Sequence, residues 1–293
     1  MAAGGDRRGR RRALAITVVL VAVIAVWYPA AVWLNYGQAV AFADEGESRA
    51  AILADTMALD RPLLPAPHQI AVELFGSVTA YPIGSPKNLL YHTLVTAEEA
   101  LAGFAVALLL GIGLAVGIVH VRVLDRSLMP WLIASQTVPV LAIAPMVVVV
   151  LGNIGLTGLL PKALIAGYLS FFPVAIGMVK GLRSPDPMQR DLMRTYSASG
   201  AQVLAKLRWP ASLSFLFPSL KVAASLALVG AIVAELPTGA QAGLGARLLA
   251  GSYYGQTLQI WAALFMAALL ALLATGLVDA AQAATLRRRG GKL

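Results

Sequence analysis

The sequence predicts an all-α membrane protein with six transmembrane helices, and three observations support this fold class. Hydrophobic residues make up 59% of the 293 residues and charged residues only 13%, whereas soluble domains average about 45–50% and about 25%. Six windows contain the roughly 20 mostly apolar residues that a spanning helix needs. The basic residues are concentrated in alternate connections between these windows. Low charge excludes a disordered chain, and the lack of cysteine excludes disulfides, thiolate metal sites and a cysteine nucleophile.

The six predicted spans follow one another along the chain with short or long polar connections between them. The third span contains Pro139 and Pro145, and the fourth contains Pro173. A proline inside a helix removes a backbone donor and bends the chain, so we expect kinks at these positions. The spans are residues 13–34, 101–121, 131–151, 163–179, 219–236 and 258–278.

The first apolar window follows a run of arginines and therefore has two interpretations. It has 22 uncharged residues, which exceeds the roughly 7–15 apolar residues of a signal peptide. We expect the window to remain as a membrane anchor. Cleavage after Ala43 is the alternative.

The Lys and Arg residues give the orientation. Of the 23 basic residues, 18 lie in the N-terminus, the connections after the second and fourth spans, and the C-terminus. Cytoplasmic connections carry such an excess, so both termini and the segment 180–221, with Lys221 at its far edge, are predicted to be cytoplasmic. This distribution explains the net charge of +9 by topology, and we expect no nucleic-acid partner.

The longest cytoplasmic connection is too polar to cross a membrane. Asp186 is a natural helix N-cap and Pro187 a natural first helical residue. The residues 197–200, Ser-Ala-Ser-Gly, are typical of a turn, so we expect a helix, a bend and a second short helix over 186–210. Such a segment either lies on the membrane surface or binds a cytoplasmic partner.

This connection resembles the signature loop of permease subunits of binding-protein-dependent ATP-binding-cassette importers. The pattern of that family is Glu-Ala-Ala, three residues, Gly, nine residues and an apolar residue before Pro. Here Asp191-Leu192-Met193 is followed by three residues, Ser197, eleven residues and Trp209-Pro210. Asp replaces Glu, Leu-Met replaces Ala-Ala, and Ser replaces Gly.

Three further motifs are similar to the nitrate/sulfonate/taurine branch of this family, which also includes permeases for thiamine-pyrimidine precursors and riboflavin. Together they place the resemblance over about residues 62–280, in consistent order. The motifs are Leu64-Pro65-Ala66-Pro67, Thr137-Val138-Pro139 with Leu141-Ala142-Ile143-Ala144-Pro145, and Val233-Ala234-Glu235-Leu236 with Gly243-Leu244-Gly245.

The resemblance implies the type I importer permease (MetI-like) architecture in a bacterial inner membrane. It implies three kinds of protein partner besides membrane lipid: ABC ATPase subunits, a periplasmic substrate-binding protein, and a second permease copy in a homodimer. ATP would bind the partner ATPase, and no cofactor is expected in this chain, which lacks a Gly-x-x-x-x-Gly-Lys-Ser/Thr loop. The predicted regions are a basic cytoplasmic N-terminus (1–12), an anchor (13–34), an extracytoplasmic segment (35–96), a permease core (97–282) containing the coupling loop 180–218, and a basic tail (283–293).

Two groups of residues are candidates for function. The first would couple the ATPase mechanically to the spans: Asp191, Thr195, Ser197, Ala198, Ser199, Gly200 and Ala201. The second would line the translocation pathway: Gln136, Thr137, Ser170 and Glu235. Hydrogen bonding between helices is the alternative role for the neutral members. An ionisable residue inside a membrane is a functional candidate, but near a span end Glu235 could simply meet water.

Other function classes have less support in the sequence. His68, His92 and His120 lack metal-ligand spacing, and no hydrolase or metalloprotease motif is present, so we expect no enzyme activity. Gly113 and Gly117 form a close-packing motif of membrane helices. A stand-alone secondary transporter or channel remains the alternative. Because the candidate pathway residues are mostly neutral, the sequence does not separate an anion from a pyrimidine- or flavin-type solute.

Overall fold

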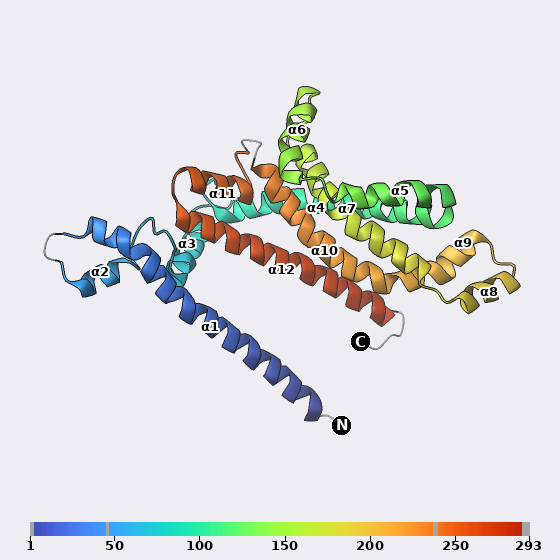
Figure 1. Cartoon of the computed structure of the whole chain (residues 1–293), viewed down its shortest axis with the longest axis horizontal. Coiled ribbons are helices and arrows are strands. Elements are labelled where there is room, and N and C mark those ends of the chain that lie inside the picture. Colours follow the sequence, from blue (N-terminus) through green and yellow to red (C-terminus); the bar gives the residue numbers. More distant parts are fainter. Residues whose placement is uncertain (1–2, 45–46, 237–239, 289–293) are drawn as a thin grey trace. The chain divides into compact units, whose positions relative to one another are not determined.

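The computed structural model describes residues 3–44, 47–236 and 240–288, with side chains from Leu14 onward. All regular elements in these residues are helices (Figure 1). The predicted basic N-terminus (1–12) depends on side chains that lie outside the described residues. The same holds for Arg289 and Lys292 of the predicted basic tail. The helices are α1 (Ala3–Phe42), α2 (Arg49–Asp55), α3 (Pro67–Thr79), α4 (Leu89–His120), α5 (Arg122–Ser135), α6 (Val140–Asn153), α7 (Leu159–Arg183), α8 (Pro187–Thr195), α9 (Gly200–Val203), the π-helical turn η1 (Leu204–Arg208), α10 (Trp209–Glu235), α11 (Leu244–Tyr253) and α12 (Thr257–Arg288).

The chain divides into two compact units. Unit 1 contains Met1–Leu89 and Arg247–Phe265, and unit 2 contains Leu90–Ala246 and Met266–Leu293. Five helical segments of the described residues are long and apolar enough to cross a membrane, and a bent helix pair makes a sixth span if it is counted as one. This agrees with the predicted all-α, six-span fold class.

The third predicted span differs from the expectation of one kinked helix. It is formed by two helices, α5 and α6, and the chain bends by 102° between them. The break falls at residues 136–139 and ends with Pro139, because the residue preceding a proline is disfavoured in the α conformation. The Thr137 hydroxyl donates to the Ala134 carbonyl at 2.8 Å and occupies an acceptor at the end of α5. Pro173, in contrast, lies inside a continuous α7.

The fifth span begins earlier than expected. The predicted second short helix of the connection is the first part of one long segment, Gly200–Glu235. The π-helical turn η1 lies directly before Pro210, whose missing N–H would interrupt a regular α-helical ladder. The second part of the 186–210 segment, from Gly200, is therefore continuous with a spanning helix, whereas α8 is a separate helix.

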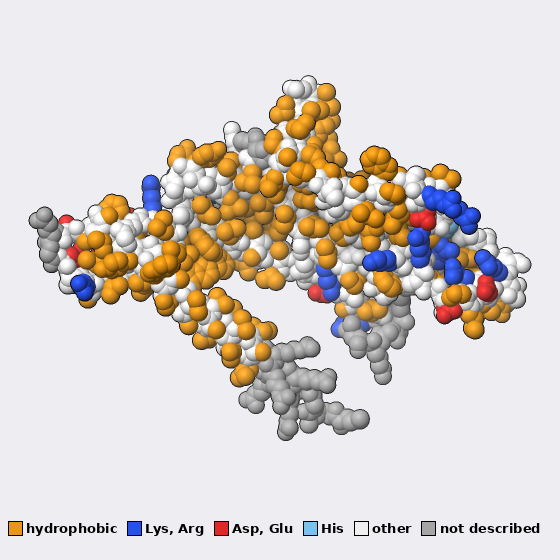
Figure 2. All heavy atoms as spheres, viewed as in Figure 1, with side chains coloured by type: hydrophobic (Ala, Val, Ile, Leu, Met, Phe, Trp, Pro, Cys, Tyr) orange, Lys and Arg blue, Asp and Glu red, His pale blue; other side chains and the backbone are white. Residues whose placement is uncertain are grey.

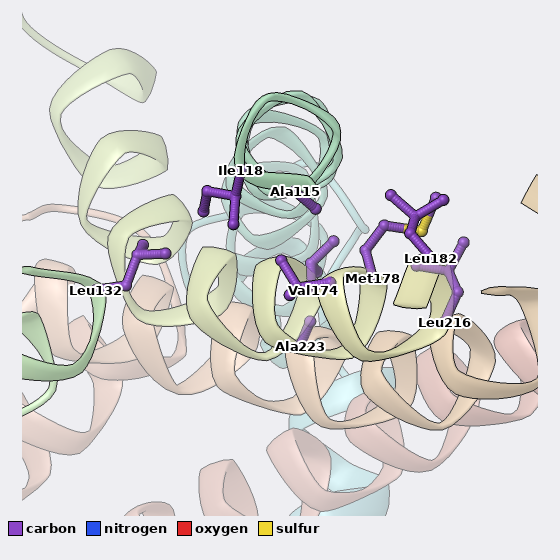
Figure 3. Close-up of a cluster of buried hydrophobic side chains, with 9 residues drawn as sticks. Ala115, Ile118, Leu132, Val174, Met178, Leu182, Leu216 and Ala223 are labelled. Atoms are coloured by element: carbon purple, nitrogen blue, oxygen red, sulfur yellow. The ribbon is translucent and has the colours of Figure 1, made fainter. Parts of the chain in front are cut away.

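Unit 2 is built around the close packing of α7 against α10. At Gly181 an added Cβ would lie 2.7 Å from the Ser212 Cα, and at Gly230 it would lie 2.6 Å from the Ala166 Cα. Small residues thus let the two backbones approach. Val174, Met178 and Leu182 of α7 belong to the largest buried cluster (Figure 3).

Helix α4 packs on α7 through glycines as well, but not through the predicted pair. An added Cβ at Gly111 would lie 2.8 Å from Val174, and at Gly103 it would collide with Ala166. At Gly113 nothing lies within 4 Å, and at Gly117 an added Cβ would lie 3.2 Å from the Leu124 side chain of α5. The close approach of α4 to α7 is therefore at Gly103 and Gly111, and of the predicted pair only Gly117 faces another helix closely.

Unit 1 contains most of the segment that was predicted to be extracytoplasmic, and this segment is folded against α1. Asn35 of α1 is fully buried. Its side-chain amide donates to the Thr56 carbonyl at 3.1 Å and to the Leu64 carbonyl at 2.9 Å, and its oxygen accepts the Leu64 N–H at 3.1 Å. One side chain thereby fixes two loop segments against α1. Trp27 adds a contact by donating to the Pro65 carbonyl at 3.0 Å.

Candidate functional sites

The coupling loop begins with a well-capped helix. As predicted, Asp186 caps α8 and Pro187 is its first residue. The Asp186 carboxylate accepts the Met188 N–H at 2.8 Å, and the Gln189 side chain accepts the Asp186 N–H at 3.2 Å. This reciprocal capping holds the start of α8 at the end of α7.

The predicted turn after α8 is also present, and it depends on an unusual backbone conformation. Ser197 has φ of 50°, the left-handed region in which glycine is favoured and a β-branched residue is strained. The family pattern has Gly at this position, so the conformation explains that preference. Ser199 then caps α9 by accepting the Gln202 N–H at 3.3 Å.

The remaining coupling candidates lie at the surface. Asp191 pairs with Arg194 at 3.1 Å, and the Thr195 hydroxyl donates to the Asp191 carbonyl at 3.1 Å. Gly200 and Ala201 are exposed, and Ala198 is half-buried. These residues shape the helix–turn–helix and leave its outer face open.

Three large apolar side chains stand on this open face. Met188 is 79% exposed, Leu192 55% and Tyr196 76%. Residues four apart share one helix face, so the three form a continuous row, which we call the α8 apolar row. Lys and Arg side chains gather around the same end of unit 2 (Figure 2). Apolar side chains exposed together in a polar loop are typical of a protein-binding surface.

The second candidate site is a buried polar cluster at the ends of α7 and α10 far from the coupling loop. Glu235, the last residue of α10, is fully buried. Its carboxylate accepts the Thr96 hydroxyl at 2.7 Å and the Gly245 N–H at 2.5 Å. It is therefore not an interfacial carboxylate in contact with water.

The chain after α10 is held by three successive backbone amides. The Gly243 N–H donates to His92 Nδ1 at 3.0 Å, the Leu244 N–H donates to the Thr96 hydroxyl at 2.8 Å, and the Gly245 N–H donates to Glu235. Gly243 has φ of 117°, and an added Cβ there would collide with the Glu235 carboxylate. Only glycine fits this position.

An ion pair extends the cluster to α7. Lys162 donates to Glu99 at 2.6 Å, and both side chains are largely buried. The carboxyl groups of Glu99 and Glu235 lie close enough to interact. The cluster thus joins α4, α7, α10 and the segment that follows α10.

The other pathway candidates lie elsewhere. Ser170 is buried, but its hydroxyl donates to the Ala166 carbonyl of its own helix at 2.6 Å. Gln136 and Thr137 are exposed at the break between α5 and α6. The structure therefore does not bring these three residues together with Glu235.

The sequence analysis did not select the other members of this cluster. Glu99 and Lys162 lie at the edges of apolar windows, and ionisable residues there were the signal that could have found them. His92 and Thr96 gave no such signal, because single polar residues near a span end are common. In the described residues, no group of three or more His, Asp or Glu side chains could hold a metal ion.

Comparison with known proteins identifies the family. The profile described as "Binding-protein-dependent transport system inner membrane component" matches residues 107–290, well over half of the chain. The chain belongs to this family. It is a multi-pass membrane protein, the permease subunit of an ABC importer, and not itself an enzyme.

Curated relatives of the permease carry different substrate names. It is 34% identical over 214 residues to the riboflavin transport system permease protein RibX of Chloroflexus aurantiacus, covering 72% of this chain and 74% of RibX. It is 32% identical to the formylaminopyrimidine transport permease protein ThiX of Halalkalibacterium halodurans, with coverage of 62% and 68%. The putative aliphatic sulfonates transport permease protein SsuC of Bacillus subtilis is 27% identical, with coverage of 65% and 67%.

Proposed function

We propose that this permease imports a small solute across a bacterial inner membrane, with both termini in the cytoplasm. A periplasmic binding protein delivers the solute, and an ABC ATPase docks on the loop 186–210. A second copy of the chain completes the pathway as a homodimer. ATP binds the ATPase, and the permease contributes no cofactor.

The α8 apolar row is the observation that carries this proposal. Its three side chains are exposed on α8 and its C-cap residue, in a segment whose mean hydropathy is that of a polar helix. Burying them in a partner's groove removes apolar surface from water, which stabilises the complex, and the surrounding charges orient the partner. The capped start of α8 and the left-handed turn at Ser197 hold the row in a defined direction.

Mechanical coupling follows from the way the loop is attached. α8 follows α7, and the segment from Gly200 continues into α10. Because α7 and α10 are packed through glycines, they move as one body when the ATPase moves the loop. To shift the populations of the two access states of the pathway from 1:99 to 99:1, ATP must favour one of these states by about 5.5 kcal/mol. Asp191, Thr195 and the turn 197–201 transmit this preference.

For the solute we propose a small heterocycle of the flavin or pyrimidine type. RibX and ThiX, which are 34% and 32% identical to this chain, are named for riboflavin and formylaminopyrimidine, whereas SsuC, named for aliphatic sulfonates, is 27% identical. The mostly neutral candidate pathway residues are compatible with this class. A sulfonate-like anion is the second candidate.

The test is affinity purification of the tagged permease from its host in mild detergent. We expect an ATPase in about equal amount with the wild-type chain, and its loss with the double variant Met188→Asp/Leu192→Asp. The matched control is Val72→Asp/Phe75→Asp, because these α3 side chains are also 70% and 72% exposed. A clean wild-type preparation with no ATPase would instead support a stand-alone transporter or channel.

A further inference from the structure

Unit 1 contains a polar cavity of about 660 Å³ that the transport pathway and the coupling loop do not use. It is formed by α3, the segment after α3, α11 and the start of α12. The size falls within the range of small-molecule sites, roughly 300–1,000 Å³. Its lining includes Glu73, Tyr81, Lys87, Arg247, Tyr254 and Gln259.

This lining contains two cations, Arg247 and Lys87, and one carboxylate, Glu73. Across the part of the chain that the structure describes, neither Arg247 nor Lys87 forms an ion pair. The Arg247 Nε is buried, and no hydrogen-bond acceptor among the described residues reaches it. A buried guanidinium N–H without an acceptor destabilises the protein unless a ligand supplies one.

The remaining lining residues define what such a ligand would look like. Burial lowers the pKa of Arg247, while the charge of Glu73 and the Tyr81 phenol act in the opposite direction. A guanidinium is so strong a base that it stays charged under these influences. Lys87 lies 5.6 Å from the ring centroid of Tyr81. With two cations and one carboxylate, the cavity carries an excess of one positive charge, and Tyr81 and Tyr254 provide aromatic walls.

We propose that this cavity binds an oxyanion, a carboxylate or sulfonate group, with Arg247 and Lys87 as its ligands. The inference rests on the proposed function for one point, that residues 35–88 face the outside of the membrane. Two sources would present this chemistry there: an acidic side chain of the delivery protein, or a free organic anion. Arginine donates to either group through two parallel N–H groups.

The first arm of the experiment tests the shared chemistry on the full-length permease alone, in nanodiscs. The probe is 4-fluorobenzoate, followed by fluorine NMR, and 4-fluorobenzamide is the uncharged control. We expect benzoate to bind and benzamide not to bind. Arg247→Gln weakens binding on the order of tenfold or more, the loss of a charged hydrogen bond. Arg49→Gln, at an exposed arginine of the same unit, leaves binding unchanged.

Two further variants keep this arm decisive if Arg247→Gln fails to fold. Lys87 is exposed, so Lys87→Gln preserves the fold and weakens binding. Glu73→Gln removes the competing carboxylate and tightens binding. Absence of benzoate binding to the wild type, or equal binding by wild type, Lys87→Gln and Arg49→Gln, overturns the proposal.

The second arm identifies the source, using the purified solute-binding protein encoded with the permease. If Arg247→Gln weakens its docking and 4-fluorobenzoate competes with it, the ligand is an acidic side chain of the delivery protein. If docking is unchanged, the ligand is a free anion. Neither the ATPase nor transport enters the first arm, so failure of the proposed function and failure of this site are distinguishable.

Discussion

The three consecutive amides of residues 243–245 provide a sharp test of the buried cluster. The Thr96 hydroxyl forms two hydrogen bonds of this cluster: it accepts the Leu244 N–H at 2.8 Å and donates to the Glu235 carboxylate at 2.7 Å. The substitution Thr96→Val keeps the shape of the side chain and removes both hydrogen bonds. It leaves a buried N–H and a buried carboxylate oxygen each without this partner.

The expected magnitude follows from these two groups. A buried polar group left without its partner costs about 1–3 kcal/mol, so Thr96→Val, which affects two such groups, lowers the local stability of the segment by roughly 2–6 kcal/mol. Because about 1.4 kcal/mol is a factor of ten, the Leu244 amide then exchanges its hydrogen roughly 30- to 20,000-fold faster.

The assay is hydrogen–deuterium exchange of the purified permease, followed on peptides that cover residues 240–250. The matched control is Thr275→Val in α12, where the hydroxyl donates within its own helix, to the Ala271 carbonyl at 2.9 Å and the Leu272 carbonyl at 3.1 Å. Exchange in this control remains at the wild-type rate. If Thr96→Val also exchanged at the wild-type rate, the cluster would not hold the segment and the reasoning would be refuted.

The remaining predictions concern packing, the ion pair and the turn. Gly181→Ala places a Cβ 2.7 Å from the α10 backbone and destabilises the permease by about 1–3 kcal/mol, whereas Gly113→Ala, with nothing within 4 Å, is neutral or stabilising. Thermal unfolding compares the two variants, and an equal loss of stability in both would contradict the close packing of α7 on α10. Lys162→Met leaves the Glu99 charge buried without its cation and lowers the free energy of unfolding by about 3–5 kcal/mol, and the second substitution Glu99→Gln restores most of this stability. If the double variant were no more stable than Lys162→Met in the same unfolding assay, the two side chains would not act as an ion pair. In proteoliposomes, Ser197→Gly retains the wild-type amount of transport per ATP hydrolysed. Ser197→Val reduces it, because valine is strained at φ of 50° by roughly 1–2 kcal/mol; full coupling by the valine variant would contradict the coupling role of this turn.

Composition and hydropathy were sufficient to predict the fold class, because lipid-exposed spans must be continuous and apolar. The caps of α8 and the turn at 197–200 were also predictable, since Asp-Pro and Ser-Ala-Ser-Gly act through local hydrogen bonds. The division of the third window into α5 and α6 was not predicted. Pro139 signals a bend, but whether a helix kinks or breaks there depends on the tertiary contacts of both halves.

The buried cluster shows the limit of reading one sequence. Glu235 could be selected because a carboxylate in a span is unfavourable without partners. Its carboxylate accepts the hydroxyl of Thr96, which is 139 residues away, and the N–H of Gly245 in the segment after α10. No local pattern encodes such contacts. Ser170 was selected by the same reasoning and instead satisfies its hydroxyl within its own helix.

The central claim is that the α8 apolar row docks an ATPase, and a site-specific cross-link tests it most directly. The chain has no cysteine, so Leu192→Cys carries a single photo-reactive label in native membranes. The control is Val72→Cys, at a side chain 70% exposed on α3. If the row docks the ATPase, a cross-linked product containing the ATPase forms from position 192 and none forms from position 72. An ATPase product from position 72, or none from position 192 while the ATPase is present, would contradict it.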